Sequence, residues 1–299
     1  MSINIHNSRI LHSFSYYSPT TIDEAVKLLF ECGSGASILA GGTDLIPKMK
    51  QGLVRPSHVV NIKKIPELVG IIEDSKCIRI GALTHIREIE QNQHVKDHLK
   101  LLHDAVASLG SVQIRNMATL GGNLCNASPA ADSAQALIAL DAKAHINGPK
   151  RERVVDLENF FNGPGKTVLL KGEILTSVEV PKAKKNSISC FMKLGRTSLD
   201  LATVSIAVQA NFNGMNVEEI GVVLGAVAPT PLRVKKVEDY LIRHQLDSEQ
   251  IESAADLVSR SIKPITDIRG SAEYRRKASK GLTLAALSSI ANDHRGSYK

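Results

Sequence analysis

The sequence predicts an α+β protein with two domains, and three observations lead to this prediction. Two glycine-rich segments, residues 40–44 and 119–123, lie in the first two thirds of a 299-residue chain. The last third has the pattern of three strands followed by helices. A polar and basic run, residues 182–187, separates the two parts. We therefore expect a first domain over 8–182, with subdomains of about 8–62 and 63–182, and a second domain over 188–293.

The composition is that of a soluble globular protein. Hydrophobic residues make up 43% and charged residues 22% of the chain. No apolar run approaches the roughly 20 residues of a membrane span, and residues 1–17 lack the basic and apolar regions of a secretory signal. We expect a cytoplasmic protein that does not enter membranes.

The charge balance allows an anionic cofactor or an acidic partner. The net charge is +7. Aromatic residues make up only 4% of the chain and Trp is absent, so platforms for stacking bases are scarce. Nucleic acid is therefore not an expected partner.

The four cysteines are far apart and form no CxxC motif. This spacing predicts neither a zinc site nor an iron–sulfur site in the chain. We expect reduced thiols and no metal. The positions are Cys32, Cys77, Cys125 and Cys190.

The first predicted helix covers residues 20–32. Thr21 can cap it, and Glu24 stands three positions later, as in a capping box. Gly33 ends the helix.

A strand over 37–40 leads directly into Gly41-Gly42-Thr43-Asp44, and a helix over 45–51 follows. Such a turn presents free N–H groups at a helix N-terminus, which suits a phosphate. No GxGxxG is present, so this is not a Rossmann fingerprint. The nearest approach to a Walker A loop, 163–166, lacks a required glycine and is predicted to be a turn.

Alternation and helical periodicity predict the remaining elements. Asn213-Gly214 is a strong hairpin signal, and Gly281 is a possible break in the last helix. The expected strands cover 58–62, 77–83, 143–146, 153–155, 173–180, 190–194, 204–212 and 219–224. The expected helices cover 84–90, 100–109, 234–243, 248–262 and 272–293, with a turn at 73–75 and a short apolar segment at 134–140.

The segment 110–133, GSVQIRNMATLGGNLCNASPAADS, is the centre of the chemistry. Paired glycines allow positive φ and a close approach of the backbone to another group. We expect a loop of bare amides and small polar side chains, which suits a pyrophosphate; a tight turn between two strands is the alternative. The polar side chains are those of Thr119, Asn123, Asn126, Ser128 and Asp132.

Five motifs, in this order and at these separations, resemble the FAD-binding subunit of the molybdenum hydroxylases, the group of xanthine dehydrogenase and carbon monoxide dehydrogenase. The resemblance covers nearly the whole chain. It implies an FAD domain of the vanillyl-alcohol oxidase (PCMH) type, followed by a small C-terminal domain of a three-stranded antiparallel sheet plus helices. The motifs are LAGGTDL (39–45), IRNMATLGGNLCNASPAADS (114–133), EILTSVEVP (173–181), FMKLGR (191–196) and AEYRRKAS (272–279).

The resemblance also implies the residues that bind FAD. One side of the pyrophosphate and ribityl chain is held by Ser37, Ile38, Leu39, Ala40, Gly41, Gly42, Thr43, Asp44 and Leu45. The other side is held by Ala118, Thr119, Leu120, Gly121, Gly122 and Asn123. Further contacts come from Leu109 at the adenine or flavin end, Asp132 near the adenosine, the pair Ile174 and Leu175, and Lys193 near the flavin ring.

Two of these assignments have a simpler alternative. Lys193 could be a solvated surface lysine, because side chains alternate in and out of a strand. Asp132 could cap the segment that follows it. Arg275 and Arg276 are expected to anchor the C-terminal helices or to contact a partner chain.

The resemblance implies an electron-transfer subunit with no catalytic residue of its own. A molybdopterin-binding large subunit and a 2Fe-2S small subunit would complete a heterotrimer or its dimer, and NAD+ would accept the electrons. The implied substrate is a purine such as xanthine or hypoxanthine, and a CO, nicotinate or aldehyde dehydrogenase is the alternative. A non-catalytic nucleotide-binding or assembly protein is the alternative from another class.

Overall fold

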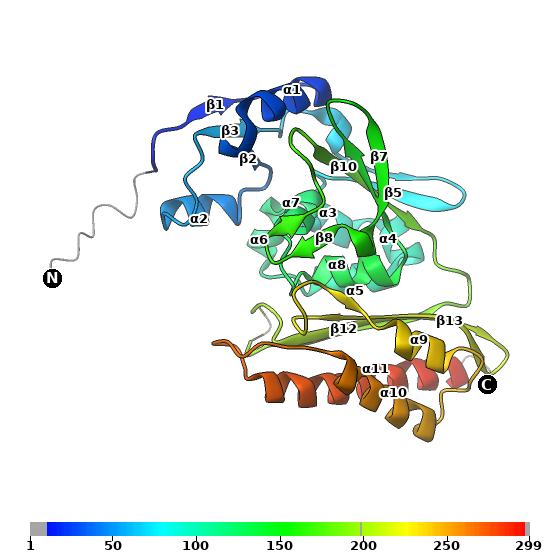
Figure 1. Cartoon of the computed structure of the whole chain (residues 1–299). Coiled ribbons are helices and arrows are strands. Elements are labelled where there is room, and N and C mark those ends of the chain that lie inside the picture. Colours follow the sequence, from blue (N-terminus) through cyan, green and yellow to red (C-terminus); the bar gives the residue numbers. More distant parts are fainter. Residues whose placement is uncertain (1–10, 198, 297–299) are drawn as a thin grey trace, which may run out of the picture.

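The computed structural model describes residues 11–197 and 199–296, and within them three layers follow one another along the chain (Figure 1). The expected start of the first domain at residue 8 lies outside the described residues. A small N-terminal sheet lies above a central sheet with many short helices. A C-terminal sheet and its helices lie below.

The N-terminal layer is a parallel sheet of order β1-β3-β2. The predicted cap of the first helix is confirmed, because Thr21 Oγ1 accepts a hydrogen bond from Glu24 N at 3.2 Å. The buried residues Ala25 and Leu29 of that helix pack with Val60 of the sheet. The elements are β1 (Ser15–Tyr17), α1 (Ile22–Cys32), the 3-10 turn η2 (Gly33–Gly35), β2 (Ala36–Leu39), α2 (Leu45–Lys50) and β3 (His58–Asn61).

The central layer is an antiparallel sheet of order β4-β5-β10-β6-β7. Its helices bury one continuous core with the sheet. The strands are β4 (Ile71–Glu73), β5 (Cys77–Gly81), β6 (Lys143–Asn147), β7 (Glu152–Asp156) and β10 (Ile174–Pro181), with a hairpin of β8 (Phe161–Gly163) and β9 (Lys166–Thr167). The helices are α3 (Ile86–Gln91), α4 (Gln93–His98), α5 (Lys100–Ala107), α6 (Val112–Met117), α7 (Leu120–Cys125) and α8 (Asp132–Ala139), with 3-10 turns η3 (Pro66–Leu68) and η4 (Leu157–Asn159).

The C-terminal layer is an antiparallel sheet of order β11-β12-β13-β14. The three predicted strands are confirmed, and β14 adds a short fourth strand. Helix α11 packs on one face of this sheet, whereas α5 and α8 of the central layer pack on the other. The elements are β11 (Ile188–Leu194), β12 (Val204–Asn213), β13 (Asn216–Gly225), β14 (Leu232–Arg233), α9 (Lys235–Leu241), α10 (Ser248–Ser261) and α11 (Ala272–Gly296).

Several predictions of local structure were wrong. The expected loop around 119–133 contains α7 and the start of α8, and helices α4 and α6 were missed. Glu73 ends strand β4 instead of starting a turn. Gly281 does not break α11, which runs through it without interruption.

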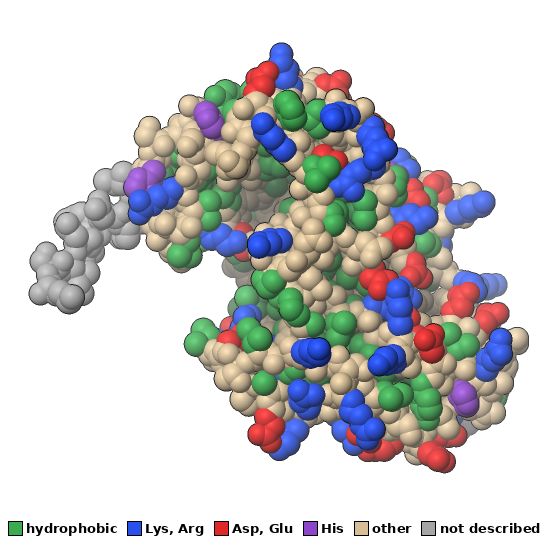
Figure 2. Space-filling view, in the orientation of Figure 1, with side chains coloured by type: hydrophobic (Ala, Val, Ile, Leu, Met, Phe, Trp, Pro, Cys, Tyr) green, Lys and Arg blue, Asp and Glu red, His purple; other side chains and the backbone are tan. Residues whose placement is uncertain are grey.

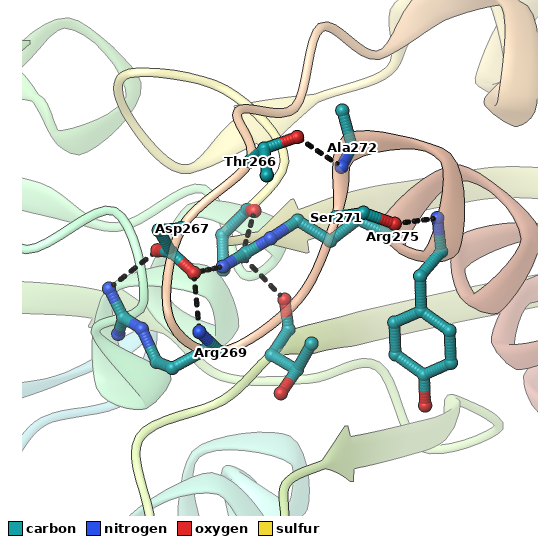
Figure 3. Close-up of polar contacts among 9 residues, drawn as sticks. Thr266, Asp267, Arg269, Ser271, Ala272 and Arg275 are labelled. Atoms are coloured by element: carbon teal, nitrogen blue, oxygen red, sulfur yellow. Dashed lines mark hydrogen bonds and ion pairs between the residues drawn. The ribbon is translucent and has the colours of Figure 1, made fainter.

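Arg275 anchors the start of α11 (Figure 3). Its side chain is 2% exposed, and Nη1 donates to the carbonyl oxygens of Thr203 at 2.7 Å and Ala226 at 2.8 Å. Its Nη2 donates to Asp267 Oδ1 at 2.6 Å. Arg276 donates to the carbonyl oxygen of Ser259 on the preceding helix at 2.9 Å. Both arginines therefore hold the C-terminal helices together, as expected.

All four cysteines are free thiols. No helix within residues 11–197 and 199–296 is long and apolar enough to cross a membrane. In the same part of the chain, no group of three or more His, Cys, Asp and Glu side chains is arranged to hold a metal ion.

Candidate functional site: a cofactor cavity between three layers

A cavity of about 630 Å³ brings together residues from all three layers. This volume is in the range of sites that bind small molecules and cofactors. Figure 2 shows the molecule hollowed beneath the N-terminal layer. The lining comes from the segments 36–48, 109–132 and 193–201, with contributions from Val54, Ile62, Ala82, Leu83, Leu169, Ile174 and Leu175.

The first glycine-rich segment joins the N-terminal layer to the central one. A Cβ atom on Gly41 would lie 2.1 Å from the carbonyl oxygen of Met117, at the end of α6. Gly42 has φ +79°, which other residues rarely adopt. Only glycines therefore let this turn lie directly on α6 and leave its backbone open to the cavity.

The second glycine pair lies in a helix and not in the loop that the sequence predicts. Gly121 and Gly122 lie within the short helix α7, and neither has a positive φ. Thr119 caps this helix, with Oγ1 accepting from Gly122 N at 3.2 Å. A Cβ atom on Gly121 would lie 2.7 Å from the Cβ atom of Ala82 on the central sheet. Gly121 therefore serves the close approach of two segments, and Gly122 leaves room for the capping hydroxyl of Thr119, rather than either glycine adopting an unusual conformation.

Three polar side chains connect the two glycine-rich segments across the cavity. Lys48 Nζ donates to Asn126 Oδ1 at 2.6 Å, and Asn126 Nδ2 donates to Asp44 Oδ1 at 3.1 Å. All three residues line the cavity. The expectation that amides alone neutralise a pyrophosphate is therefore incomplete, because Lys48 brings a cation to the same place. The sequence signal for Lys48 was its position in the first turn after GGTDL.

A buried ion pair shapes the turn at Leu109 and Gly110. Arg115 is 7% exposed, and its Nε donates to Glu90 Oε2 at 2.7 Å. Its Nη1 donates to the carbonyl oxygens of Leu109 and Gly110, each at 3.1 Å. Leu109 thereby presents its apolar side chain to the cavity. The sequence motif contained Arg115, but nothing in the pattern assigned it this role.

A second buried ion pair links the C-terminal domain to the cavity wall. Lys193 Nζ, on β11, donates to Asp132 Oδ2 at 2.7 Å and to the carbonyl oxygen of Ser108 at 3.1 Å. Lys193 is therefore not a solvated surface lysine. Asp132 is not a helix cap either, because Ala131 is the N-cap residue of α8 and no side chain caps it. Burial raises the pKa of Asp132 to about 6, although the Lys193 ammonium opposes this rise.

This ion pair changes the expected division of roles along the cofactor. We expected Asp132 near the adenosine and Lys193 near the flavin ring, which are opposite ends of an extended FAD. Side chains 2.7 Å apart lie at the same end of the cavity. The two roles therefore cannot both hold for an extended cofactor.

Every predicted site residue except Leu39 and Leu120 lines the cavity. Leu120 is fully buried in the central core instead. The remaining lining residues come mostly from turns and from faces of short helices, and among them Asn126 and Ser128 had been noted as polar side chains of the segment 110–133. These remaining residues are Ala36, Lys48, Val54, Ile62, Ala82, Leu83, Gly110, Ile114, Cys125, Asn126, Ser128, Ala130, Ala131, Leu169, Leu199, Asp200 and Leu201.

Comparison with protein families gives two matches that together span this architecture. Residues 12–183 match the family described as the FAD binding domain in molybdopterin dehydrogenase. Residues 189–290 match the CO dehydrogenase flavoprotein C-terminal domain. The chain belongs to the FAD-binding medium subunits of the molybdenum hydroxylase family.

Relatives with different names share this family. The glyceraldehyde dehydrogenase medium chain of Sulfolobus acidocaldarius is 35% identical, over 93% of this chain and 98% of its own length. The xanthine dehydrogenase FAD-binding subunit of Escherichia coli O157:H7 is 31% identical, over 92% of this chain and 94% of its own. A solved structure of carbon monoxide dehydrogenase from Hydrogenophaga pseudoflava matches with a TM-score of 0.93 and 33% identity, covering 95% of this chain and 99% of that one.

The geometry of the cavity fits FAD, the cofactor of this family. Backbone amides of the first glycine-rich segment and the cation of Lys48 suit a pyrophosphate. The amides of the second segment, from Leu120 to Asn123, already donate to protein oxygens. Asp132 Oδ1 is buried and has no hydrogen-bond partner among the described residues. A buried oxygen of this kind is expected to accept a hydrogen bond from a bound molecule or water.

Proposed function

We propose that this chain carries electrons through FAD within a molybdenum hydroxylase. A large subunit would bind molybdopterin and hydroxylate the substrate, and a small subunit would pass the electrons through 2Fe-2S clusters to the FAD. NAD+ would then remove them. The observation that carries the proposal is the cavity in which both glycine-rich segments, Lys48 and the Asp132–Lys193 pair converge.

Different residues of the chain bind different parts of the FAD. Gly41 and Gly42 bind the pyrophosphate through their amides, and Lys48 balances its charge. The start of α7 packs against the cofactor from the other side of the cavity. Asp132 and Lys193 bind the isoalloxazine, since a carboxyl group and an ammonium can donate hydrogen bonds to its ring nitrogens and carbonyl oxygens. The bound FAD supplies the ability to take up and release two electrons. A cation beside the ring would favour its reduced, electron-rich form.

The large partner subunit, not this chain, would determine which substrate is hydroxylated. We propose a purine such as xanthine or hypoxanthine, on the basis of likeness to bacterial purine-type subunits, including the 163–166 turn between β8 and β9. The relatives named for glyceraldehyde and xanthine are 35% and 31% identical. Identity therefore does not favour xanthine, and glyceraldehyde, CO and nicotinate are the competing substrates.

Two further assignments complete the proposal. The chain divides into domains at 8–182 and 188–293, with the first split near residue 62. It acts in the cytoplasm, within a heterotrimer or its dimer.

Absorption spectra of the purified chain before and after addition of FAD test the binding site. We expect flavin bands, with FAD released on denaturation. In Gly122→Val the new side chain would project toward Thr119 Oγ1, which lies 2.8 Å from the position of a Cβ atom, and uptake of FAD should be lost. Gly281→Val is the matched control, because that helical glycine has no atom within 4 Å of its Cβ position.

A chain that stays colourless in excess FAD would contradict the proposal and favour a non-catalytic binding or assembly protein. The purified complex then tests the finer assignments. Xanthine, glyceraldehyde, nicotinate and CO are supplied in turn, and flavin bleaching and NADH formation are recorded. Bleaching by a substrate other than a purine would overturn the purine assignment, and bleaching without NADH would overturn NAD+ as the acceptor.

A further inference from the structure

Three neighbouring buried residues contain polar atoms with no hydrogen-bond partner among the described residues. These atoms are Asp132 Oδ1, both amide atoms of Gln135, and Ser205 Oγ. Gln135 and Ser205 are fully buried, and Asp132 is 3% exposed. Neither Gln135 nor Ser205 lines the cofactor cavity, so FAD itself does not explain their unpaired atoms.

The three residues are linked in space although they lie far apart in sequence. Asp132 and Gln135 are separated by three positions on α8, so their side chains are neighbours on one helix face. Ser205 on β12 is the cross-strand partner of Lys193, which holds Asp132. Both Gln135 Nε2 and Ser205 Oγ lie beside Gly225, at 1.8 Å and 2.6 Å from the position of its missing Cβ atom. Gln135 and Ser205 therefore meet at Gly225 in the interface between the domains, about one helical turn along α8 from Asp132 at the cavity wall.

Burial of these atoms without partners would be costly. An unsatisfied buried polar group costs about 1–3 kcal/mol, and native proteins satisfy most such groups with protein atoms or internal water. Internal water is found at sites that offer several polar partners. An amide and a hydroxyl within about one helical turn of a carboxyl oxygen are such a set.

We propose that Asp132 transfers protons to the flavin, and that Gln135 and Ser205 are positioning residues that hold the internal water through which Asp132 is reprotonated. The proposal rests on the proposed electron-transfer role of the bound FAD. It gives Gln135 and Ser205, which do not line the cofactor cavity, a role in the reaction of the bound FAD.

The proton balance explains why such a path is needed. Two electrons from the iron–sulfur partner add charge to the FAD, and one proton must follow to a ring nitrogen. The O–H bond of the Asp132 carboxyl breaks, an N–H bond forms on the flavin, and the carboxylate left behind is held by the Lys193 ammonium. When NAD+ takes both electrons and this hydrogen as hydride, no proton returns to Asp132. Each turnover therefore consumes one proton at Asp132, which water must replace.

The other titratable groups at the cavity are less suited to this role. Burial raises the pKa of the Cys125 thiol to about 12, so it does not release its proton near neutral pH. Asp44 is exposed and accepts a hydrogen bond from Asn126. The one charged group that acts on the pKa of Asp132 is Lys193 of β11. The Asp132 pKa of about 6 suits proton exchange near neutral pH.

The experiment follows the rate of flavin reduction by a chemical reductant in the FAD-loaded chain, in H2O and in D2O. Wild-type chain is compared with Asp132→Asn, Gln135→Leu and Ser205→Ala. Ser279→Ala is the matched control, since Ser279 is also a fully buried serine of the C-terminal domain and bonds only within α11. Infrared difference spectra of the oxidised and reduced chain report the protonated carboxyl directly.

We expect Asp132→Asn to slow the proton-dependent step roughly 100-fold or more and to abolish the carboxyl band. Ser205→Ala and Gln135→Leu should keep FAD but slow reprotonation and reduce the isotope effect, whereas Ser279→Ala should match wild type. Wild-type rates and isotope effects in Ser205→Ala and Gln135→Leu would overturn the water path. If Asp132→Asn retains FAD, a carboxyl band unchanged from wild type would overturn the role of Asp132 as proton donor. If Asp132→Asn loses FAD, the rates and isotope effects of Ser205→Ala and Gln135→Leu test the proposal instead. A wild-type chain without FAD would instead refute the proposed function.

Discussion

Gly41 shows how the absence of a side chain allows two layers to come into contact at the cofactor site. Its backbone lies against the Met117 carbonyl, and a Cβ atom would approach that oxygen to 2.1 Å. Backbone on both sides cannot move aside as a flexible side chain can. Contact between the N-terminal and central layers therefore depends on this glycine.

We expect Gly41→Ala to separate the two layers at the cavity. FAD affinity should fall at least tenfold, and the melting temperature of the apo chain should fall as well, because the backbone must shift to admit a methyl group. Fluorescence titration with FAD and thermal unfolding measure the two effects. Gly281→Ala is the control, and wild-type FAD affinity in Gly41→Ala would contradict the close contact.

Asp132 makes a pH-dependent contribution to stability with a defined sign. Its pKa is raised to about 6 from an ordinary value of 3.8, so the folded chain binds more protons there than the unfolded chain between these values. Its contribution therefore falls as the pH rises from about 4 to about 6. Relative to wild type, apo Asp132→Asn should gain up to about 3 kcal/mol in the free energy of unfolding over this range.

Urea unfolding of both proteins at a series of pH values measures this difference. The comparison removes the contributions of other carboxyl groups, such as Glu173, whose pKa is lowered chiefly by its hydrogen bond from Arg153. A difference that stays constant with pH would show that Asp132 ionises normally.

At the scale of elements, the helices around the cavity are short and depend on specific contacts. Helix α6 is six residues long and is capped by Ser111, whose side chain accepts from Ile114 N. Helices of this length are unstable alone. Helix α6 is held by Arg115, which joins it to Glu90 of α3 and to the turn at Leu109.

We expect Arg115→Met to cost about 3 kcal/mol of stability and to weaken FAD binding. Removal of the guanidinium leaves the partly buried Glu90 paired with Arg87 alone among the described residues, and frees the Leu109 carbonyl. Urea unfolding and FAD titration measure both effects. The double variant Glu90→Gln/Arg115→Met should recover part of the lost stability, and no recovery would contradict the ion-pair explanation.

A substitution in helix α11 is expected to increase the stability of the chain. Gly281 lies in the middle of this continuous helix, and its Cβ position is open. Gly281→Ala should therefore stabilise the chain by about 0.5–1 kcal/mol, because alanine restricts the unfolded chain and favours the helix. Thermal unfolding measures the gain, and destabilisation would indicate a break in the helix at this position.

At the scale of the whole molecule, the C-terminal domain completes the cavity. Its sheet lies between its own helix α11 and the helices α5 and α8 of the central layer. Arg233 of β14 adds polar contacts to Asp141 and to the Ile138 carbonyl across the interface. Lys193 extends from the same sheet to the cavity wall.

FAD binding should therefore stabilise both domains together. At a free FAD concentration 100 times the dissociation constant, we expect about 2.7 kcal/mol of added stability in a single unfolding transition. Lys193→Met should weaken FAD binding and leave Asp132 without its cation. Differential scanning calorimetry with increasing FAD tests this coupling, and an FAD-independent transition of the C-terminal domain would argue against it.

Part of the fold and of the site could be predicted from the sequence, because glycine-rich turns and capping residues depend on local interactions. Thr21 and Gly42 have roles that depend on residues within a few positions. Helices α6 and α7 could not be predicted, because six residues are too few to show a helical period and α7 also contains two glycines. The role of Thr119 as the cap of α7 was missed for the same reason. Lys48 and Arg115 were missed because their hydrogen-bond partners lie on other elements. Gln135 was missed because its place beside Gly225 depends on the packing of two domains.

The sequence by itself determined the α+β class, the boundary near 182–187, the two glycine-rich segments and, through five ordered motifs, the family. These features depend on local backbone preference and on the order of motifs along the chain. Only the tertiary structure decided that Asp132 and Lys193 form one buried pair and that Lys48 reaches Asn126. It also decided that the polar atoms of the Gln135 and Ser205 side chains lie beside Gly225 with no hydrogen-bond partner in the described part of the chain. Burial and distance between segments far apart in sequence are properties of packing, and a one-dimensional pattern does not contain them.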